Sequence, residues 1–153
     1  MPILPCVLFE DSDLIVVHKP SGIGTHAAAA DAPWGIVELL QDRLSHARAL
    51  GIHQRLDRET SGVLILAKSA QANRSLASQF ESRCVGKEYL FVTAHKAPRT
   101  EFTVSTPIGQ KTARTRFEWV RSIHAKQDLW KAIPETGRTH QIRLHTQSAA
   151  TPI

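Results

Sequence analysis

The sequence predicts an α+β fold around a mixed, mainly antiparallel sheet flanked by helices, and three observations lead to this expectation. The chain has 153 residues, the length of one domain, and a domain of this size buries about 70% of its unfolded surface. Apolar residues make up 42% and charged residues 22%, a balance typical of globular proteins. Strand-like and helix-like segments follow one another without strict βαβ alternation, which favours the α+β class.

The first strand and helix are expected before residue 51. Residues 14–17 are rich in β-favouring side chains and stop at Pro20 and Gly22, so we expect a strand followed by a loop. Residues 34–50 place apolar side chains at helical spacing, which predicts an amphipathic helix.

A second strand and helix follow directly. Residues 62–68, GVLILAK, form a short continuous apolar run that is typical of a buried strand. In residues 69–83, Leu76 and Phe80 lie one helical turn apart and Ser69 is a plausible N-cap. We therefore expect a helix immediately after this strand.

The last third of the chain predicts more strands and a final short helix. Residues 87–95 alternate in the manner of a strand, and residues 112–122 and 128–135 do the same, with a turn near 124–127. Residues 136–150 carry apolar positions that fit a short helix.

The charge of the chain is unevenly distributed. Residues 1–50 carry three Lys and Arg against six Asp and Glu, whereas residues 51–153 carry sixteen against eight. A basic excess attracts polyanions through counterion release, so RNA or DNA is a natural partner. On charge alone, a basic face that only maintains solubility fits equally well.

Several classes of protein lack support in the sequence. No apolar run approaches the ~20 residues of a membrane-spanning helix and the N-terminus does not resemble a signal peptide, so we expect a cytoplasmic protein. Cys6 and Cys84 are too few for a disulfide framework, and we expect both to be reduced and near the core. His140 and His145 do not share a helical face, so no metal site is predicted.

One stretch combines charge with a buried strand. In IHQRLDRETSGVLILAKSA, residues 52–70, Asp57 lies between Arg55 and Arg58 just before a Thr-Ser-Gly turn. Neighbouring guanidinium groups favour the ionised form of a carboxylate, and carboxylates serve as nucleophiles toward sugars and other electrophiles. For these residues taken alone, an aspartate that merely caps the turn is the favoured interpretation.

Other segments of the sequence, taken in order with this stretch, favour a catalytic role for Asp57 over a simple turn cap. VHKPSGIGTH, RLDRETSGVLILAKS, VGKEYLFV, TARTRFEWV and PETGRTHQIRLH together resemble the RluA-type pseudouridine synthases, which isomerise uridine in ribosomal or transfer RNA. The resemblance runs from about residue 8 to the end, and RLDRETSG and GRTHQIR are its most specific parts. It implies a pseudouridine-synthase-like catalytic domain that needs no cofactor.

The resemblance also implies roles for four residues. Asp57 corresponds to the catalytic aspartate that attacks uridine at carbon 6 of the base or carbon 1′ of the ribose, and Arg143 to the arginine that ion-pairs with it. Tyr89 corresponds to a tyrosine that stacks on the base and helps to move the proton from carbon 5. Arg55 corresponds to an arginine associated with taking the place of the flipped nucleotide.

Six further residues are expected to contact the RNA backbone as members of a basic patch. They are Lys19, Arg58, Arg114, Arg116, Arg138 and His140. The protein is expected to act on RNA as a monomer, without a membrane and without a metal.

The chain departs from the family pattern at two places. Most relatives have His-Arg-Leu-Asp at the catalytic motif, whereas this chain has Gln54 before Arg55 and its histidine one position earlier. Relatives also continue beyond the segment that ends at Ile153. We therefore expect residues 1–153 to form a single catalytic domain that lacks its C-terminal part and has no N-terminal RNA-binding module.

Two other functions remain open. A catalytically inactive RNA-binding protein would keep the fold and the basic surface, and its binding would be indifferent to Asp57→Asn. A nucleosidase would use Asp57 and Glu59 as a carboxylate pair and would release free base.

Overall fold

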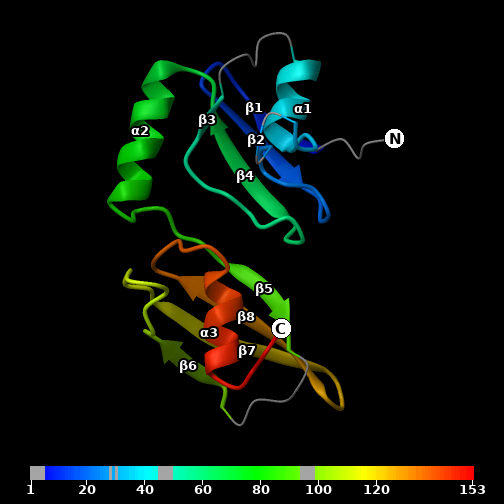
Figure 1. The fold of residues 1–153 in the computed structure, drawn as a ribbon, viewed down its shortest axis with the longest axis vertical. Helices are drawn as coiled ribbons and strands as arrows, with labels where there is room; N and C mark the ends of the chain where they lie inside the picture. Colours follow the sequence, from blue (N-terminus) through cyan, green and yellow to red (C-terminus); the bar gives the residue numbers. More distant parts are fainter. Residues whose placement is uncertain (1–5, 28, 30, 45–49, 94–98) are drawn as a thin grey trace. The chain divides into compact units, whose positions relative to one another are not determined.

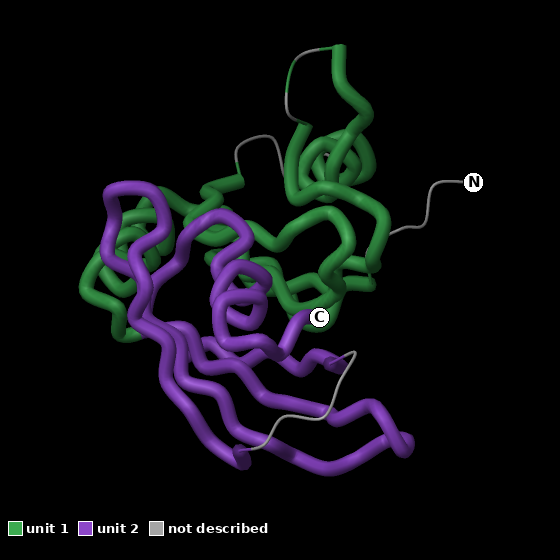
Figure 2. Tube along the Cα trace, turned by 60° about the horizontal axis from the view of Figure 1, so that its bottom comes forward, with its two compact units in different colours: residues 1–84 green, residues 85–153 purple. Residues whose placement is uncertain are grey.

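The computed structural model describes residues 6–27, 29, 31–44, 50–93 and 99–153, and it confirms the α+β class (Figure 1). The chain forms two compact units, residues 1–84 and 85–153 (Figure 2). Each unit has its own four-stranded sheet. Every strand pairing among the described residues is antiparallel. We expected one central sheet, so the division of the strands between two sheets is a difference from that expectation.

The first unit contains a sheet with the strand order β1-β2-β4-β3 and two helices. Its elements are β1 (Cys6–Glu10), β2 (Leu14–Lys19), α1 (Ile36–Arg43), β3 (Gly51–Ile52), β4 (Gly62–Ala67) and α2 (Ala70–Glu81). The strand expected at 62–68 and the helix expected at 69–83 are confirmed as β4 and α2. The helix expected at 34–50 is confirmed over α1, and residues 45–49 of that prediction lie outside the described residues.

The two faces of the first sheet bury different residues, because side chains alternate along a strand. Ile15 pairs with Leu66 and Val17 with Leu64, and all four form a core with Ile36, Val37 and Leu40 of α1. The opposite face carries Ile65 and Ala67, which pack with Ala72, Leu76 and Phe80 of α2. The first unit therefore has three layers, with one helix on each face of the sheet.

Local hydrogen bonds fix where the two helices begin. The carboxylate of Glu38 accepts hydrogen bonds from the backbone N–H groups of Gly35 and Ala27, at 2.9 and 3.0 Å, and so holds the start of α1. Ser69 caps α2 as expected, because its hydroxyl accepts a hydrogen bond from the N–H of Ala72 at 3.1 Å.

The second unit contains a sheet with the order β5-β8-β7-β6 and one helix on one of its faces. Its elements are β5 (Tyr89–Val92), β6 (Glu101–Val104), β7 (Thr115–His124), β8 (Gln127–Pro134) and α3 (Gln141–Ser148). The strands expected at 87–95, 112–122 and 128–135 correspond to β5, β7 and β8. The short helix expected at 136–150 is confirmed as α3.

The core of the second unit is aromatic. Phe117, Trp130 and Ala132 are fully buried on one face of the sheet. The rings of Phe102 and Phe117 stack with centroids 4.8 Å apart, and the Phe91 ring meets Phe117 edge-on at 5.8 Å. Ile142 of α3 packs onto the same cluster, so the helix covers this face of the sheet.

Two further features differ from the sequence-based expectations. Cys6 and Cys84 are free thiols, as expected, but both are exposed, so their placement near the core was wrong. The strands β1, β3 and β6 were not predicted. Among the described residues, no helix is long and apolar enough to cross a bilayer.

Candidate active site

Asp57 lies in the loop between β3 and β4, where no strand partner fixes the backbone. The N–H of Thr60 donates a hydrogen bond to the carbonyl of Asp57 at 3.0 Å, which closes a turn directly after the aspartate. The loop ends at Gly62, whose backbone φ is +153°. Residues that carry a side chain rarely adopt this φ. The RLDRETSG segment therefore forms a tight turn, and Asp57 is half-buried within it.

The residues on both sides of Asp57 are held by the loop that follows β2. The hydroxyl of Thr25 is 3.0 Å from both backbone groups of Leu56: it accepts from the N–H and donates to the carbonyl. The carbonyl of Arg58 accepts hydrogen bonds from the N–H of Gly22 at 2.9 Å and from Lys19 Nζ at 3.1 Å. The HKPSGIGTH and RLDRETSG segments are thus joined at positions 56 and 58.

Lys19 is the centre of this junction. Its side chain is fully buried, and its ammonium also donates to the carbonyls of Pro20 and Ile23, at 2.9 and 2.6 Å. Burial lowers the pKa of Lys19, and the negative charges of Glu59 and Asp57 partly oppose that effect. Because all three hydrogen atoms of the ammonium are used by backbone carbonyls, we assign Lys19 to support of the loop instead of the RNA contact that we expected.

The other charged residues of the motif differ in their exposure. Arg55 is exposed. Arg58 is also exposed, and its Nε donates to the carbonyl of Gly22 at 2.9 Å. The carboxylate of Glu59 is exposed and lies 3.9 Å from Arg58 Nε, while its backbone carbonyl accepts a hydrogen bond from Ser21.

The histidine next to the motif is anchored on α2. His53 Nε2 is 2.8 Å from Asn73 Oδ1, and the imidazole stacks on the Phe80 ring with centroids 6.3 Å apart. Gly51 leaves space for this contact, because a Cβ atom at that position would collide with Asn73 Oδ1. The displaced histidine therefore has a defined structural role, and Gln54, the residue that departs from the family pattern, is half-buried beside it.

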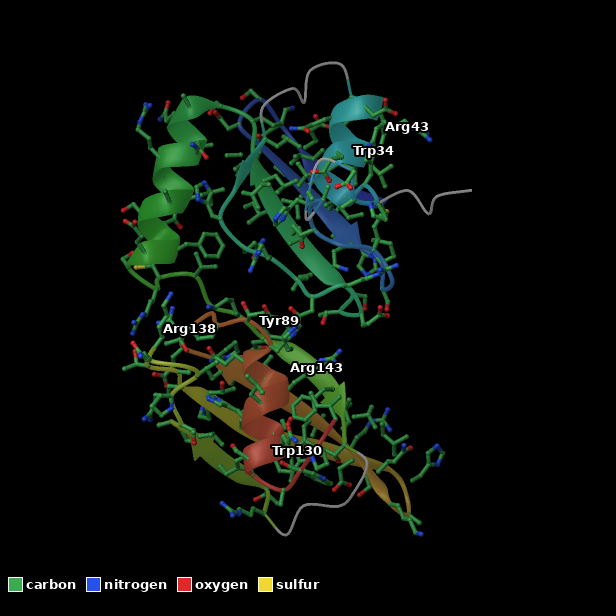
Figure 3. All side chains as sticks on the ribbon, in the orientation of Figure 1. Trp34, Arg43, Tyr89, Trp130, Arg138 and Arg143 are labelled. Atoms are coloured by element: carbon green, nitrogen blue, oxygen red, sulfur yellow. The ribbon has the colours of Figure 1, made fainter. Side chains whose placement is uncertain are left out.

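Tyr89 and Arg143 belong to the second unit (Figure 3). Tyr89 is the first residue of β5, is half-buried and packs against the aromatic core. Arg143 is exposed on α3 and lines a shallow groove with Gln147, Pro152 and Ile153. The four predicted catalytic residues are therefore divided equally between the units, and the fold fixes each pair within its own unit.

Two of the expected RNA-contacting arginines are exposed but have acidic neighbours. Arg114 Nε is 2.8 Å from Glu135 Oε1, and Arg116 Nη1 is 2.8 Å from Glu118 Oε1. Such solvent-exposed pairs contribute little to stability, so a phosphate group can compete for these guanidinium groups.

The remaining two expected RNA contacts flank the start of α3. Arg138 Nε donates to the carbonyl of Thr112 at 3.0 Å, which ties this arginine to the loop before β7. His140 is exposed and adopts a left-handed conformation with φ 54°, which is uncommon for a residue with a side chain. Among the described residues, no group of three or more His, Cys, Asp or Glu is arranged to hold a metal ion.

Sequence reasoning gave no role to the polar residues that hold these segments. Thr25 and Gln141 are buried at 3% and 4% exposure, and each bonds to a segment distant in sequence. Thr25 lies in VHKPSGIGTH and Gln141 in GRTHQIR, two of the segments that resemble the family, but these segments gave no indication of their hydrogen-bond partners.

Comparisons with known proteins identify close relatives. The protein named ribosomal large subunit pseudouridine synthase C from Haemophilus ducreyi is 39% identical over 163 aligned positions, which cover 96% of this chain and 50% of that protein. The protein of the same name from Pasteurella multocida is also 39% identical, with 96% and 49% covered. The chain thus spans about half the length of these relatives.

Solved structures show the same fold. The human RNA pseudouridylate synthase domain containing 4 matches with a TM-score of 0.75 at 24% identity, covering 94% of this chain and 64% of the human one. The human domain containing 1 matches with a TM-score of 0.78 at 22% identity. A family model described as RNA pseudouridylate synthase matches residues 13–148. Since this match takes in nearly the whole chain, the protein belongs to the RNA pseudouridylate synthase family.

Proposed function

We propose that this chain is the catalytic region of an enzyme that converts uridine to pseudouridine in RNA, with Asp57 as its nucleophile. The observation that carries the proposal is the support given to Asp57. Hydrogen bonds hold the residue before it and the residue after it, so the position of the carboxylate is constrained by its backbone. Constrained placement of a reacting group reduces the entropic cost of reaching the transition state.

The proposed reaction rearranges uridine without adding or removing atoms. The bond between carbon 1′ and N1 breaks, a bond between carbon 1′ and carbon 5 forms, carbon 5 loses its proton and N1 gains one. Asp57 attacks either carbon 6 or carbon 1′ and is released when the new carbon–carbon bond is complete. No redox partner is required, because the substrate and product are isomers.

The other proposed residues bind the detached base, keep the aspartate ionised or replace the flipped nucleotide. Uracil must leave the RNA stack and remain bound while it turns, which requires an aromatic surface and an enclosed site. We assign the stacking surface and the transfer of the carbon 5 proton to Tyr89, and we assign the cation that keeps the aspartate ionised to Arg143. Arg55 is exposed and is proposed to fill the place of the flipped nucleotide.

The charge distribution supports RNA as the partner. Residues 85–153 carry eleven Lys and Arg against five Asp and Glu, whereas residues 1–84 carry eight against nine. The basic excess therefore belongs to the second unit. We propose that the exposed cations Arg114, Arg116 and His140 and the half-buried Arg138 contact phosphates there, and that affinity falls steeply with salt.

The names of the relatives suggest the first substrate to test. The matched proteins from Haemophilus ducreyi and Pasteurella multocida are named for the large ribosomal subunit. We therefore propose large-subunit ribosomal RNA as the substrate, with transfer RNA as the alternative within the same test.

Tritium release from RNA labelled at carbon 5 of uridine tests the proposal directly. The chain and its Asp57→Asn variant are incubated with labelled large-subunit ribosomal RNA and, separately, labelled transfer RNA from cells that lack the gene. Asp42→Asn is a matched control, because it makes the same chemical change on an exposed carboxylate of α1. We expect release by the parent chain and by the control, and none by Asp57→Asn.

Other outcomes select the rival functions. Salt-sensitive RNA binding without tritium release, unchanged by Asp57→Asn, would indicate an RNA-binding protein that has lost activity. Free uracil that disappears with Glu59→Gln would indicate a nucleosidase. Glu59 is exposed in the turn and its backbone carbonyl, not its carboxylate, is fixed, so we expect Glu59→Gln to retain most activity.

A further inference from the structure

Helix α3 is joined to its sheet by a buried set of hydrogen bonds whose directions are determined by backbone groups. The Arg138 N–H, 3.0 Å from the Gln141 side chain, can only donate, so the atom that faces it is Oε1. The Arg114 carbonyl, also 3.0 Å away, can only accept, so the atom that faces it is Nε2. These two backbone groups fix the orientation of the Gln141 amide.

The orientation of Gln141 determines the next two groups. Gln141 Nε2 donates to Thr115 Oγ1 at 2.9 Å, and this leaves the Thr115 hydroxyl hydrogen free to point elsewhere. His145 Nδ1 lies 2.9 Å from the same oxygen, and His145 Nε2 lies 3.0 Å from the carbonyl of Thr106. Nε2 must carry the hydrogen toward that carbonyl, and a ring with a single hydrogen then accepts the Thr115 hydroxyl at Nδ1.

The set connects one face of α3 to two other segments, the start of β7 and the segment after β6. Gln141 and His145 are one turn apart, so they lie on the same face of the helix, and both are at least 95% buried. Thr115 is the first residue of β7, and Thr106 follows β6. Arg143 lies midway between Gln141 and His145 in sequence, which places it about 200° around the helix, on the exposed side.

We propose that Thr115, Gln141 and His145 are positioning residues that set the rotation of α3 and thereby the direction in which Arg143 points. This inference rests on the role proposed above for Arg143. Apolar packing of Ile142 holds the helix against the sheet, but it is non-directional and tolerates rotation. Hydrogen bonds at two successive turns do not tolerate rotation, because each requires a particular distance and angle.

The test compares variants that differ by one hydroxyl group. Thr115→Val keeps the branched shape but removes the group that links Gln141 to His145, whereas Thr115→Ser retains the hydroxyl. Thr146→Val is a matched control, because Thr146 is fully buried on the same helix but its hydroxyl donates within the helix, to the carbonyl of Arg143. All three are measured in the full chain, at a temperature where each is folded.

Two measurements separate positioning from a general structural role. The first is tritium release at saturating and subsaturating RNA. We expect Thr115→Val to lower kcat about 10- to 100-fold with little change in KM, and we expect Thr115→Ser and Thr146→Val to stay near the parent. The second is amide hydrogen exchange of residues 141–148, which we expect to accelerate in Thr115→Val more than in the other two variants.

Each outcome decides the proposal. An unchanged kcat in folded Thr115→Val, or equal losses in Thr115→Val and Thr146→Val, would overturn it. If the parent chain releases no tritium, the proposed function fails, and the exchange data still decide the role of the network in holding α3. Exchange in Thr115→Val no faster than in Thr146→Val would then overturn that role as well.

Discussion

The two units hold their candidate catalytic residues by different means. In the first unit, the loop around Asp57 has no strand partner, and its backbone groups bond to Thr25, Gly22 and Lys19. In the second unit, Arg143 lies on a helix whose own backbone is already satisfied, so side chains provide the attachment. A loop thus needs main-chain contacts for a fixed shape, whereas a helix needs directional side-chain contacts for a fixed rotation.

The cores of the two units also differ, in the kind of side chain that fills them. The first unit is filled by Ile, Val and Leu side chains from both sheet and helix, while the second is filled by aromatic rings centred on Phe117 and Trp130. Aromatic rings bury more area each and prefer edge-on or offset contacts. The contrast implies that each unit has its own core and its own response to substitution.

The largest expected effects come from removing a core side chain in each unit. Phe117→Ala should lower the free energy of unfolding by about 3–5 kcal/mol, and Leu66→Ala by about 2–5 kcal/mol, because both side chains are fully buried. Hydrogen exchange under increasing urea would report where protection is lost. If Leu66→Ala removed protection equally from residues 85–153, the separation of the two cores would be wrong.

The next largest effect is expected at Lys19. Lys19→Met leaves the part-buried carbonyls of Pro20 and Ile23 without this donor, and it should cost about 2–4 kcal/mol in urea unfolding. Lys126→Met, in the turn between β7 and β8, is an exposed control that should change little. A loss equal to that of the control would show that the buried ammonium does not hold the loop.

The parent chain should also show a pH dependence that Lys19→Met lacks. Burial lowers the pKa of Lys19 below 10.5, so between the lowered pKa and 10.5 the unfolded chain binds more protons than the folded chain. Stability rises with pH wherever the unfolded state binds more protons. The difference in stability between parent and variant should therefore grow as pH rises through that window.

A smaller effect is expected at Thr25. Thr25→Val keeps the shape of this buried side chain but leaves both backbone groups of Leu56 without its hydroxyl, at a cost of about 2 kcal/mol. Thr25→Ser restores the hydroxyl and should restore most of the stability. Thermal unfolding of the two variants beside the parent would measure the difference. Equal melting temperatures would show that the Thr25 hydroxyl does not stabilise the backbone at Leu56.

The smallest effect is expected on the outer face of the second sheet. The hydrogen bond that Lys131 donates to Glu118 is the main reason that the pKa of Glu118 lies below 4.5. Its stabilising contribution is therefore present above 4.5 and is lost as pH falls through the lowered pKa. Lys131→Met should raise the pKa of Glu118 in an NMR titration, and because both side chains remain partly exposed to solvent, overall stability should barely change.

The sequence predicted elements whose signal is local. GVLILAK and the segment from Ser69 contain their strand, cap and helix patterns within a few residues, and β4 and α2 match them. β1 was not predicted because all five of its residues are exposed, so the chain shows no alternation there. The left-handed conformation of His140 likewise has no signature in the side chain itself.

The candidate site was predictable as a set of residues but not as a set of contacts. The family motifs marked Asp57, Tyr89 and Arg143, whereas the partners of Lys19 could not be anticipated. One of its acceptors is 39 positions away, in the motif that Lys19 supports. Separations of this kind depend on how the strands pair, which no local pattern reports.

The contact between Gly51, His53 and Asn73 constrains how this protein can evolve. Any larger residue at position 51 displaces Asn73, and the loss of Asn73 releases the imidazole of His53 from α2. A side chain at 51 therefore requires that Asn73 move or be shortened, and either change costs His53 its partner. The three positions should change together among descendants of this chain.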